Sequence, residues 1–328
     1  MAEKLRKIAV LTSGGDAPGM NAAVRAVVRA SVFNNLECYG VYKGYEGLIT
    51  GDLVKLNARG VNNIVNKGGT ILKSARCLEF RTKEGRVKAK KTLDKHGIGS
   101  LVVIGGNGSL TGGLLLEEEH GINVIGIPGT IDNDLVGTRC SLGYDTALNT
   151  AVNAIDKIRD TASSHNRLFF IEVMGKGSGH IALNAGIGAG AEEVLIPEQS
   201  MGSDRLLDSL KKSEKSGKSS SIIVVSEGDK IGDNVFSFSS YIEKNLPHYE
   251  IRVSILGHIQ RGGTPSCFDR VLASRMGVYA VDCLIEQKSK IMVGIIDDKM
   301  VTTPINKAIK GGQSLDGDLV RVCDIISI

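Results

Sequence analysis

The sequence has no tryptophan, and its aromatic content is only 4%. Aromatic side chains on which bases can stack are the usual platform of proteins that bind single-stranded nucleic acids. The formal net charge of +4 is small for 328 residues. The basic clusters at 86–91 and 211–218 are most simply solvated helix faces. The composition therefore argues against a nucleic-acid partner and leaves room for small anionic substrates.

Long apolar runs and paired cysteines are missing as well. There is no run of 18 apolar residues and no signal-peptide pattern, so we expect a soluble, cytoplasmic chain without a membrane partner. The six cysteines, at positions 38, 77, 140, 267, 283 and 323, contain no C-x-x-C pair. A disulfide framework or a zinc site is therefore not expected. Internal repeats and low-complexity tracts are not evident.

The apolar residues that are present alternate between strand and helix patterns. A hydrophobic content of 42% with 41 glycines is enough for a large core. Leu148, Val152, Ile155 and Ile158 recur at helical spacing, which predicts a helix over 144–161. Strands and helices in alternation predict an α/β fold of two doubly wound domains, with the active site in the cleft between them.

One short loop contains two carboxylates and a hydroxyl. A buried strand is expected over 123–127, and Pro-Gly-Thr-Ile-Asp-Asn-Asp follows it at 128–134. Parallel strands deliver such loops to the carboxyl edge of a sheet, where open α/β folds bind ligands. Asp132 and Asp134 alternate, so one can serve as a general base while the other faces a magnesium ion. By itself an Asx-rich loop is more often a structural turn.

Two glycine-rich loops follow two other expected strands. The apolar run 8–11 leads into Thr12–Asn21, and the run 101–104 leads into Gly105–Ser109, each before a helix pattern. Glycines allow backbone N–H groups to approach phosphate oxygens, and the helix N-terminus favours an anion. Neither spacing matches the Rossmann or the Walker pattern. Two such loops side by side can hold one polyphosphate.

Seven blocks, in order along nearly the whole chain, resemble the bacterial-type, ATP-dependent 6-phosphofructokinases. The blocks are LTSGGDAPGMNAA at 11–23, GGTILKSAR at 68–76, PGTIDND at 128–134, SHNR at 164–167, EVMG at 172–175, LGHIQRGG at 256–263 and DRVLASRMG at 269–277. The resemblance implies transfer of the ATP γ-phosphoryl group to the 1-hydroxyl of fructose 6-phosphate, the committed step of glycolysis. It also implies magnesium as cofactor and a homotetramer.

The resemblance assigns roles to individual residues. Asp132 takes the proton of the sugar hydroxyl, and Asp134 is associated with magnesium together with Asn107. Arg76 bridges the transferring phosphoryl group, and Thr130 hydrogen-bonds the same oxygens. The nucleotide contacts implied are Gly15, Tyr45, Arg76, Cys77, Gly106, Asn107, Gly108, Ser109 and Gly112. The sugar-phosphate contacts implied are Thr130, Asp132, Asp134, Met174, Gly175, Glu227, His258 and Arg261, with Arg167 and Arg252 from a neighbouring subunit.

An effector site is implied too. Arg25 and Arg29, with Arg159, Glu192 and Lys218, match the family's pocket for ADP or phosphoenolpyruvate. That match is incomplete, because Ala58 and Ser216 stand where relatives have Arg and Lys. We therefore expect a weak or altered response to both effectors.

Three of the sugar-phosphate residues have plainer explanations from the residues alone. His258 follows an apolar run and would ordinarily be a buried core histidine. Glu227 ends the apolar run 221–226, where it is either a site carboxylate or an exposed loop residue. Arg252 alternates with apolar neighbours and would also fit as a charge on an edge strand.

Some positions depart from the family pattern. Asn107 replaces the Asp of the GGDGS loop, Lys176 replaces an Arg, and Arg139 replaces an Asp. A catalytically weakened paralogue with a regulatory or sugar-phosphate-binding role is therefore one alternative. A pyrophosphate-dependent enzyme is another, although Gly108 and Gly129 replace the Asp and Lys of such relatives and favour ATP.

The sequence also suggests domain limits. Gly143 and Leu256-Gly257 mark the expected crossings of the chain. An ATP-binding domain is expected over 1–143 plus 257–305, and a fructose 6-phosphate-binding domain over 144–256 plus 306–328.

Overall fold

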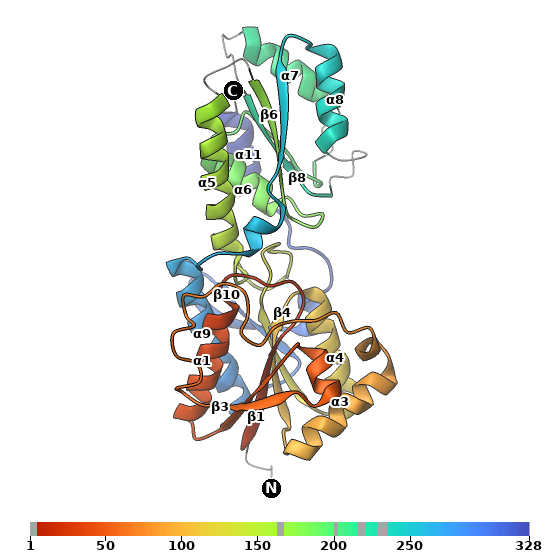
Figure 1. The fold of residues 1–328 in the computed structure, drawn as a ribbon, viewed down its shortest axis with the longest axis vertical. Coiled ribbons are helices and arrows are strands. Elements are labelled where there is room, and N and C mark those ends of the chain that lie inside the picture. Colours follow the sequence, from red (N-terminus) through yellow and green to blue (C-terminus); the bar gives the residue numbers. More distant parts are fainter. Residues whose placement is uncertain (1–4, 163–166, 200–202, 216–220, 229–234, 328) are drawn as a thin grey trace. The chain divides into compact units, whose positions relative to one another are not determined.

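The computed structural model describes residues 5–162, 167–199, 203–215, 221–228 and 235–327. The chain forms two compact units: Met1–Thr146 with Arg261–Gln313, and Ala147–Gln260 with Ser314–Ile328 (Figure 1). Both units are layers of helices and strands, as the alternation of patterns predicts.

The chain passes between the units three, four and eight residues later than the sequence suggests. The first passage lies at 146/147 because Thr146 is bonded to Asp269 within the first unit. The second lies at 260/261, since the side chain of Gln260 accepts a hydrogen bond from the Met174 amide of the second unit, at 3.4 Å. The third lies at 313/314, beyond a short helix that packs into the first unit.

The first unit contains a seven-stranded sheet in the order β11-β10-β5-β4-β1-β2-β3. The five inner strands are parallel, whereas β3 and β11 are antiparallel edge strands. The strands are β1 (Lys7–Thr12), β2 (Glu37–Val41), β3 (Leu53–Leu56), β4 (Ser100–Gly105), β5 (Asn123–Pro128), β10 (Ile291–Ile296) and β11 (Lys299–Pro304). The chain proceeds from β1 to β2 on one side and returns to β4 on the other. Such a reversal of strand order is where open α/β sheets bind ligands.

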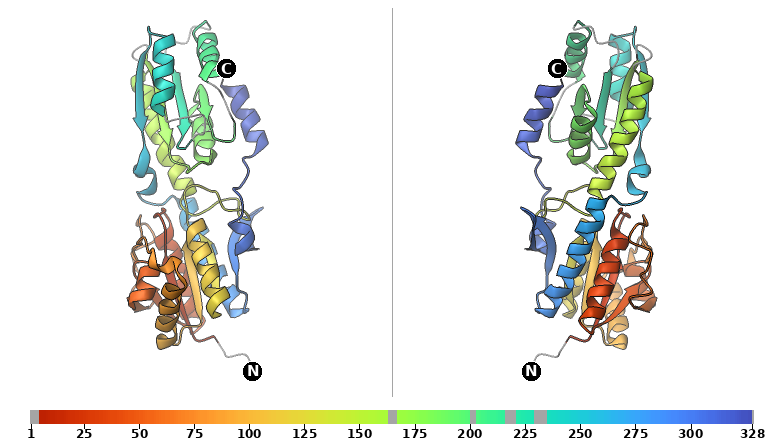
Figure 2. Two further views of the ribbon diagram at one scale, coloured as in Figure 1. Left: turned by 90° about the vertical axis from the view of Figure 1, so that its right-hand side faces the viewer. Right: turned by 90° about the vertical axis from the view of Figure 1, so that its left-hand side faces the viewer.

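Helices cover both faces of this sheet. They are α1 (Met20–Phe33), α2 (Tyr45–Thr50), η1 (Glu79–Arg81), α3 (Lys83–His96), α4 (Asn107–His120), α9 (Cys267–Ile285) and α10 (Ile305–Ala308). Helices α1 and α9 pack side by side, as Figures 1 and 2 show. Gly277 allows this approach, because a Cβ there would lie 2.5 Å from that of Ala26. The core on the α3 and α4 side of the sheet is mainly aliphatic and includes Leu11, Leu93, Leu101, Val103, Leu114 and Val124.

Arg86 differs from the solvated setting expected for the basic cluster 86–91. It is only 4% exposed and forms a bidentate ion pair with Glu119, through bonds of 2.6 and 2.7 Å. Its Nη1 also donates to the carbonyls of Phe80 and Arg81, at 3.0 and 2.9 Å. Arg86 therefore ties η1, α3 and α4 together. The prediction for this residue was wrong because its partner lies 33 positions away.

The second unit contains a parallel four-stranded sheet in the order β7-β8-β6-β9. Its strands are β6 (Arg167–Val173), β7 (Glu193–Leu195), β8 (Ser221–Ser226) and β9 (Glu250–Ile255). The remaining helices are α5 (Tyr144–Ala162), α6 (His180–Ala189), α7 (Ser203–Lys215), α8 (Val235–Asn245), η2 (Gly257–Arg261) and α11 (Gly317–Ile326). Phe170, Ile223, Leu206 and Phe238 form the centre of the core between the sheet and α7 and α8.

The helix expected over 144–161 is confirmed as α5. Ile155 is fully buried and Leu148, Val152 and Ile158 are half-buried, so the apolar stripe does face the protein. Within the described ranges, no helix is both long and apolar enough to cross a membrane.

Candidate active site

Three loops of the first unit meet at one edge of its sheet. Strands β1, β4 and β5 are parallel neighbours, so the loops after them leave the sheet on the same side. The Ser13 amide donates to the Ile104 carbonyl and the Gly129 amide to the Gly105 carbonyl, each at 3.0 Å. The structure thus brings together the two glycine loops and the aspartate loop that the sequence singled out.

The glycines of the second loop permit this close contact. A Cβ at Gly105 would lie 2.5 Å from the Ser13 carbonyl oxygen and 2.6 Å from Ser109 Oγ, so no larger residue fits there. A Cβ at Gly106 would lie 3.5 Å from that of Thr130. Helix α4 begins directly after Gly106, and its first N–H groups point toward the shared edge. This is a favourable position for a phosphate.

The aspartate loop is braced by Asn133. Its backbone is left-handed, with φ of +51°, and its side chain is 4% exposed. Asn133 Oδ1 accepts from the Ser141 amide at 2.9 Å, and its Nδ2 donates to the Arg139 carbonyl at 3.2 Å. Ser141 Oγ also donates to the Thr130 carbonyl at 2.6 Å. Asn133 and Ser141 were missed by the sequence reasoning, although asparagine in such a loop is a known indication of left-handed backbone.

Asp132 lies next to Thr130 in a buried position. Its amide donates to Thr130 Oγ1 at 3.2 Å, and the two residues are 5% and 6% exposed. Asp132 therefore belongs to the edge where the three loops converge. Arg76 is exposed, in the segment before η1.

Asn107 and Asp134 contact each other directly. Asn107 Nδ2 donates to Asp134 Oδ2 at 2.7 Å. Within the described part of the chain, Asn107 Oδ1 and the second carboxylate oxygen of Asp134, Oδ1, are buried and have no hydrogen-bond partner. Two unpartnered oxygen donors side by side are the kind of ligand that magnesium takes. No cluster of three or more His, Cys, Asp or Glu side chains suited to a metal occurs among the described residues. A metal here would therefore also depend on substrate phosphates.

Tyr45 supports the second glycine loop from inside the protein. Its ring stacks on Phe80 with centroids 3.9 Å apart, and its hydroxyl donates to the Ser109 carbonyl. Burial raises the pKa of Tyr45, so the phenol stays neutral. A Cβ at Gly112 would lie 3.0 Å from the Tyr45 ring, which explains the small residue there. Tyr45 holds α4 in place, and its contact with a nucleotide stays a prediction, as does that of half-buried Cys77.

Arg261 lies against the first glycine loop. A Cβ at Gly15 would be 2.6 Å from Arg261 Nη1, which also donates to the Asp16 carbonyl at 3.4 Å. One residue expected at the nucleotide and one expected at the sugar phosphate are thus adjacent within the first unit. Two of the seven sequence blocks, 68–76 and 256–263, also pack against each other. A Cβ at Gly68 would lie only 2.2 Å from the Gly263 carbonyl oxygen.

The second unit presents the other sugar-phosphate residues at the carboxyl ends of its strands. Met174 and Gly175 follow β6, Glu227 follows β8, and His258 lies in η2 after β9. The Glu227 amide donates to the Val173 carbonyl at 2.8 Å, which fixes the start of its loop. His258 is exposed, so the alternative of a buried core histidine is wrong. Glu227 is exposed too, and both descriptions offered for it still apply.

Arg167 and Arg252 lie toward the other end of the same sheet. Arg167 begins β6 and therefore lies about 20 Å from the end of that strand, at about 3.3 Å per residue. Arg252 is exposed on β9, which is an edge strand. This agrees with the alternative that Arg252 is a charge on an edge strand. Both arginines are set back from the strand ends that Met174, Glu227 and His258 follow, Arg167 by about 20 Å and Arg252 by about 10 Å.

The residues expected at the effector site fall in both units. Arg25 and Arg29 are one turn apart on α1, and burial and the charge of Arg29 lower the pKa of Arg25. In the second unit, Arg159 Nη1 contacts Glu192 Oε1 at 3.4 Å. Lys218 lies outside the described residues.

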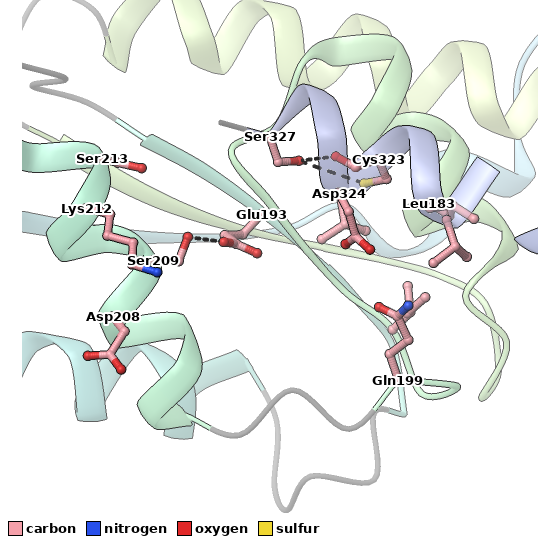
Figure 3. A pocket seen from close by; sticks show the side chains of 13 residues that line it. Leu183, Glu193, Gln199, Asp208, Ser209, Lys212, Ser213, Cys323, Asp324 and Ser327 are labelled. Carbon is pink, nitrogen blue, oxygen red and sulfur yellow. Dashed lines mark hydrogen bonds between the residues drawn. The ribbon is translucent and has the colours of Figure 1, made fainter. Parts of the chain in front are cut away.

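A pocket of about 670 Å³ lies in the second unit between α6, β7, α7 and α11 (Figure 3). Ser209 of α7 donates a hydrogen bond to Glu193 of β7 inside it, and Ser327 bonds to Cys323 at its far side. None of the residues expected at the nucleotide, sugar-phosphate or effector sites lines this pocket.

Glycine loops, a helix N-terminus and an aspartate pair at one sheet edge define an α/β protein that handles phosphate groups. The chain belongs to the phosphofructokinase family, whose model matches residues 7–284. It is 50% identical over 321 residues to the ATP-dependent 6-phosphofructokinase 2 of Bacteroides thetaiotaomicron, covering 98% of each chain. It is 51% identical over 323 residues to the ATP-dependent 6-phosphofructokinase of Thermotoga neapolitana, covering 98% of this chain and 100% of that one.

Solved structures of phosphofructokinases also match this chain. The phosphofructokinase of Saccharomyces cerevisiae matches 98% of this chain with a TM-score of 0.89 and 36% identity, and this chain spans 46% of the yeast chain. The pyrophosphate-dependent phosphofructokinase of Marinobacter aquaeolei matches 95% of this chain and 86% of its own with a TM-score of 0.81. Its 20% identity makes that a likeness of fold alone.

Proposed function

We propose that this chain is an ATP-dependent 6-phosphofructokinase. It transfers the γ-phosphoryl group of ATP to the 1-hydroxyl of fructose 6-phosphate, giving fructose 1,6-bisphosphate and ADP in glycolysis. The observation that carries this proposal is the meeting of three loops at one sheet edge, with buried Asp132 beside Thr130. The names of the relatives, about half identical over nearly the whole chain, support the same activity.

The chain's own residues divide the work of this reaction. Asp132 accepts the proton of the sugar hydroxyl as general base, and Thr130 beside it hydrogen-bonds the phosphoryl oxygens. The N-terminus of α4 and the amides of the glycine loops hold the nucleotide phosphates. Arg76 supplies a planar cation for the charge that spreads over the phosphoryl oxygens in the transition state. Groups of this kind contribute roughly 10²- to 10³-fold in rate.

Asn107 and Asp134 are the residues that would hold magnesium. Their unpartnered oxygens fit the ion, and only one of the two side chains is charged. When bound, magnesium neutralises charge on the nucleotide phosphates. The amide of Asn107 holds the Asp134 carboxylate in one orientation, so that Oδ1 would remain available to the ion.

A catalytically weakened paralogue that binds sugar phosphate is the second candidate. The amide at Asn107 favours it, because it removes a negative charge from the metal site. Lys176, in a left-handed conformation with φ of +51°, favours it as well, since lysine does not reproduce the fork of an arginine.

The proposed function also includes an oligomeric state and a response to effectors. A homotetramer is proposed because Arg167 and Arg252 are set back from the strand ends that the other sugar-phosphate residues follow, and would serve a neighbouring subunit. The response to ADP or phosphoenolpyruvate should be weak, since Ala58 and Ser216 remove two positive charges from the effector residues. A strong sigmoidal shift with phosphoenolpyruvate in the initial-rate assay would contradict that expectation.

A coupled assay tests the function. Fructose 6-phosphate is offered with ATP or with pyrophosphate, and the Asp132→Asn variant serves as the inactive control. We expect turnover with ATP, negligible turnover with pyrophosphate, and a loss of at least about 10²-fold in the variant. Equal rates with pyrophosphate would refute the choice of donor. Binding of fructose 6-phosphate without turnover would establish the second candidate.

A further inference from the structure

Glu250 joins Arg167 and Arg252, the two arginines that are set back from the carboxyl ends of their strands. Arg167 stands opposite Glu250 in the parallel pairing of β6 with β9, and Arg252 is two residues further along β9. Because side chains alternate along a strand, all three project from the same face of the sheet. Arg167 Nε donates to Glu250 Oε2 at 2.8 Å, and Arg252 Nη2 donates to Glu250 Oε1.

Each arginine uses some of its N–H donors to bond to Glu250. Arg167 uses Nε for Glu250, and the described residues give its two Nη groups no partner. Arg252 uses Nη2 for Glu250 and Nη1 for the Ile251 carbonyl, at 3.2 Å. The side chain of Arg167 is 23% exposed and that of Arg252 is 52% exposed, so both can be reached from solution. The fork of Arg167 is thus oriented and still available to a phosphate.

The charges of Glu250 and the two arginines also favour binding of a phosphate. Two guanidinium groups this close repel each other, and one carboxylate between them reduces that cost while leaving a net charge of one. Hydrogen bonding from Arg167 and the charges of both arginines lower the pKa of Glu250, so the carboxylate stays ionised at neutral pH. Glu250 therefore keeps the two guanidinium groups close together, where both can bind one dianion.

We propose that Glu250 is a positioning residue for the sugar phosphate. It holds Arg167 and Arg252 at the spacing at which they bind the 6-phosphate of the substrate in the adjoining subunit. This inference rests on the proposed function, and it adds a residue that touches neither the substrate nor the nucleotide. Sequence patterns alone do not reveal it, because a carboxylate on an exposed strand resembles any surface charge.

The Glu250→Gln variant tests this role, with Glu37→Gln as the matched control. Glu37 is also half-exposed on a strand, at 42% against 40% for Glu250, and it pairs with Lys55 at 3.0 Å in the first unit. Binding of fructose 6-phosphate is measured by calorimetry without ATP, and initial rates give kcat and both KM values. Light scattering checks that the variants keep the oligomeric state of the wild type.

We expect Glu250→Gln to raise Kd and KM for fructose 6-phosphate by about 10- to 100-fold, by analogy with the residues that orient the ligands of a metal ion. The KM for ATP should stay within about twofold, because a positioning role for the sugar phosphate leaves the other substrate's interactions intact. Glu250→Asp, which keeps the charge, should recover part of the loss. Glu37→Gln should match the wild type in every readout.

The arginines themselves provide the decisive comparison. In a chain carrying Arg167→Ala and Arg252→Ala, the further change Glu250→Gln should have no added effect, since nothing remains to be positioned. An unchanged Kd in Glu250→Gln, with weakened binding in the arginine variant, would overturn the role of Glu250 alone. If the wild-type chain neither binds nor phosphorylates fructose 6-phosphate, the proposed function fails, and the role of Glu250 fails with it.

Discussion

At the scale of single residues, Asn107 sets the charge of the proposed magnesium site. In the structure its amide donates to Asp134, which an aspartate could not do in its ionised form. Asn107→Asp would place two carboxylates side by side, and such a pair is relieved by binding a cation. We expect the variant to raise kcat and to lower the magnesium concentration needed, each by about 10- to 100-fold.

Two measurements check this prediction. One is kcat as a function of magnesium concentration, and the other is magnesium binding by calorimetry with a non-hydrolysable ATP analogue. Asn153→Asp, an exposed position on α5, controls for the added charge. Equal turnover by the wild type and the Asn107 variant would show that Asp134 and the triphosphate suffice.

Gly108 is the second residue with a specific consequence. No atom lies within 4 Å of the position that its Cβ would take, so an aspartate fits there without strain. It would also be tolerated in the first turn of α4, where negative charge is favourable. The same charge would repel the ATP phosphates. We expect Gly108→Asp to raise the KM for ATP several-fold without lowering the midpoint of thermal unfolding.

Gly129 has a different explanation from the one that the sequence suggests. A Cβ there would lie 3.0 Å from Ile104 Cγ2 and 3.1 Å from Met20 Cε, so packing alone restricts this position. The open space at Gly108 is therefore the better argument for ATP as donor. A Gly108→Asp variant with unaltered KM for ATP would remove that argument.

At the scale of elements, the start of α5 is fastened by a buried carboxylate of α9. Asp269 accepts from the Gly143 amide, the Thr146 amide and Thr146 Oγ1, at 2.9, 2.9 and 2.5 Å. An asparagine has only one acceptor oxygen and would leave a donor facing a donor. We expect Asp269→Asn to lower the midpoint of thermal unfolding, at a cost of about 1–3 kcal/mol. Asp298→Asn, on an exposed turn, is the control and should change little.

The pH dependence of this variant has a definite sign. Burial raises the pKa of Asp269 above the ordinary carboxyl value. The folded state therefore binds this proton more tightly than the unfolded state does. The resulting stability is complete below the ordinary pKa and is lost as the pH rises through the raised one. Asparagine does not titrate, so the Asp269→Asn variant does not lose this stability as the pH rises. The difference in thermal midpoint between the wild type and the variant should therefore become smaller with rising pH. A deficit that widens over that range would contradict this account.

Local patterns predicted the elements well, and long-range partners are what they missed. The strands before the three loops and helix α5 were foreseeable, because each depends on apolar residues close together in the sequence. Burial of Arg86 and the bracing of Asn133 were not, since their partners come from other segments. The link from Glu250 to Arg167 joins residues 83 positions apart and depends on the pairing of β6 with β9. A sequence without its sheet topology does not provide that pairing.

At the scale of the whole molecule, the proposed homotetramer makes substrate affinity depend on protein concentration. Subunits that separate lose the arginines contributed by their neighbours but keep Asp132 and the nucleotide loops. Dilution should therefore raise the apparent KM for fructose 6-phosphate before it affects the KM for ATP. Light scattering on the same samples provides the oligomeric state. A fully active monomer would contradict this prediction.

The separation of Arg167 and Arg252 from the carboxyl edge of their own sheet has a genetic consequence. In the proposed homotetramer, two alleles, one with Asp132→Asn and one with both arginines changed to alanine, would each encode an inactive enzyme. Mixed assemblies would restore intact sites wherever Asp132 of one subunit meets the arginines of the other, about a quarter of all sites with random assembly. A cell carrying both damaged copies would then grow where a cell with either copy alone does not.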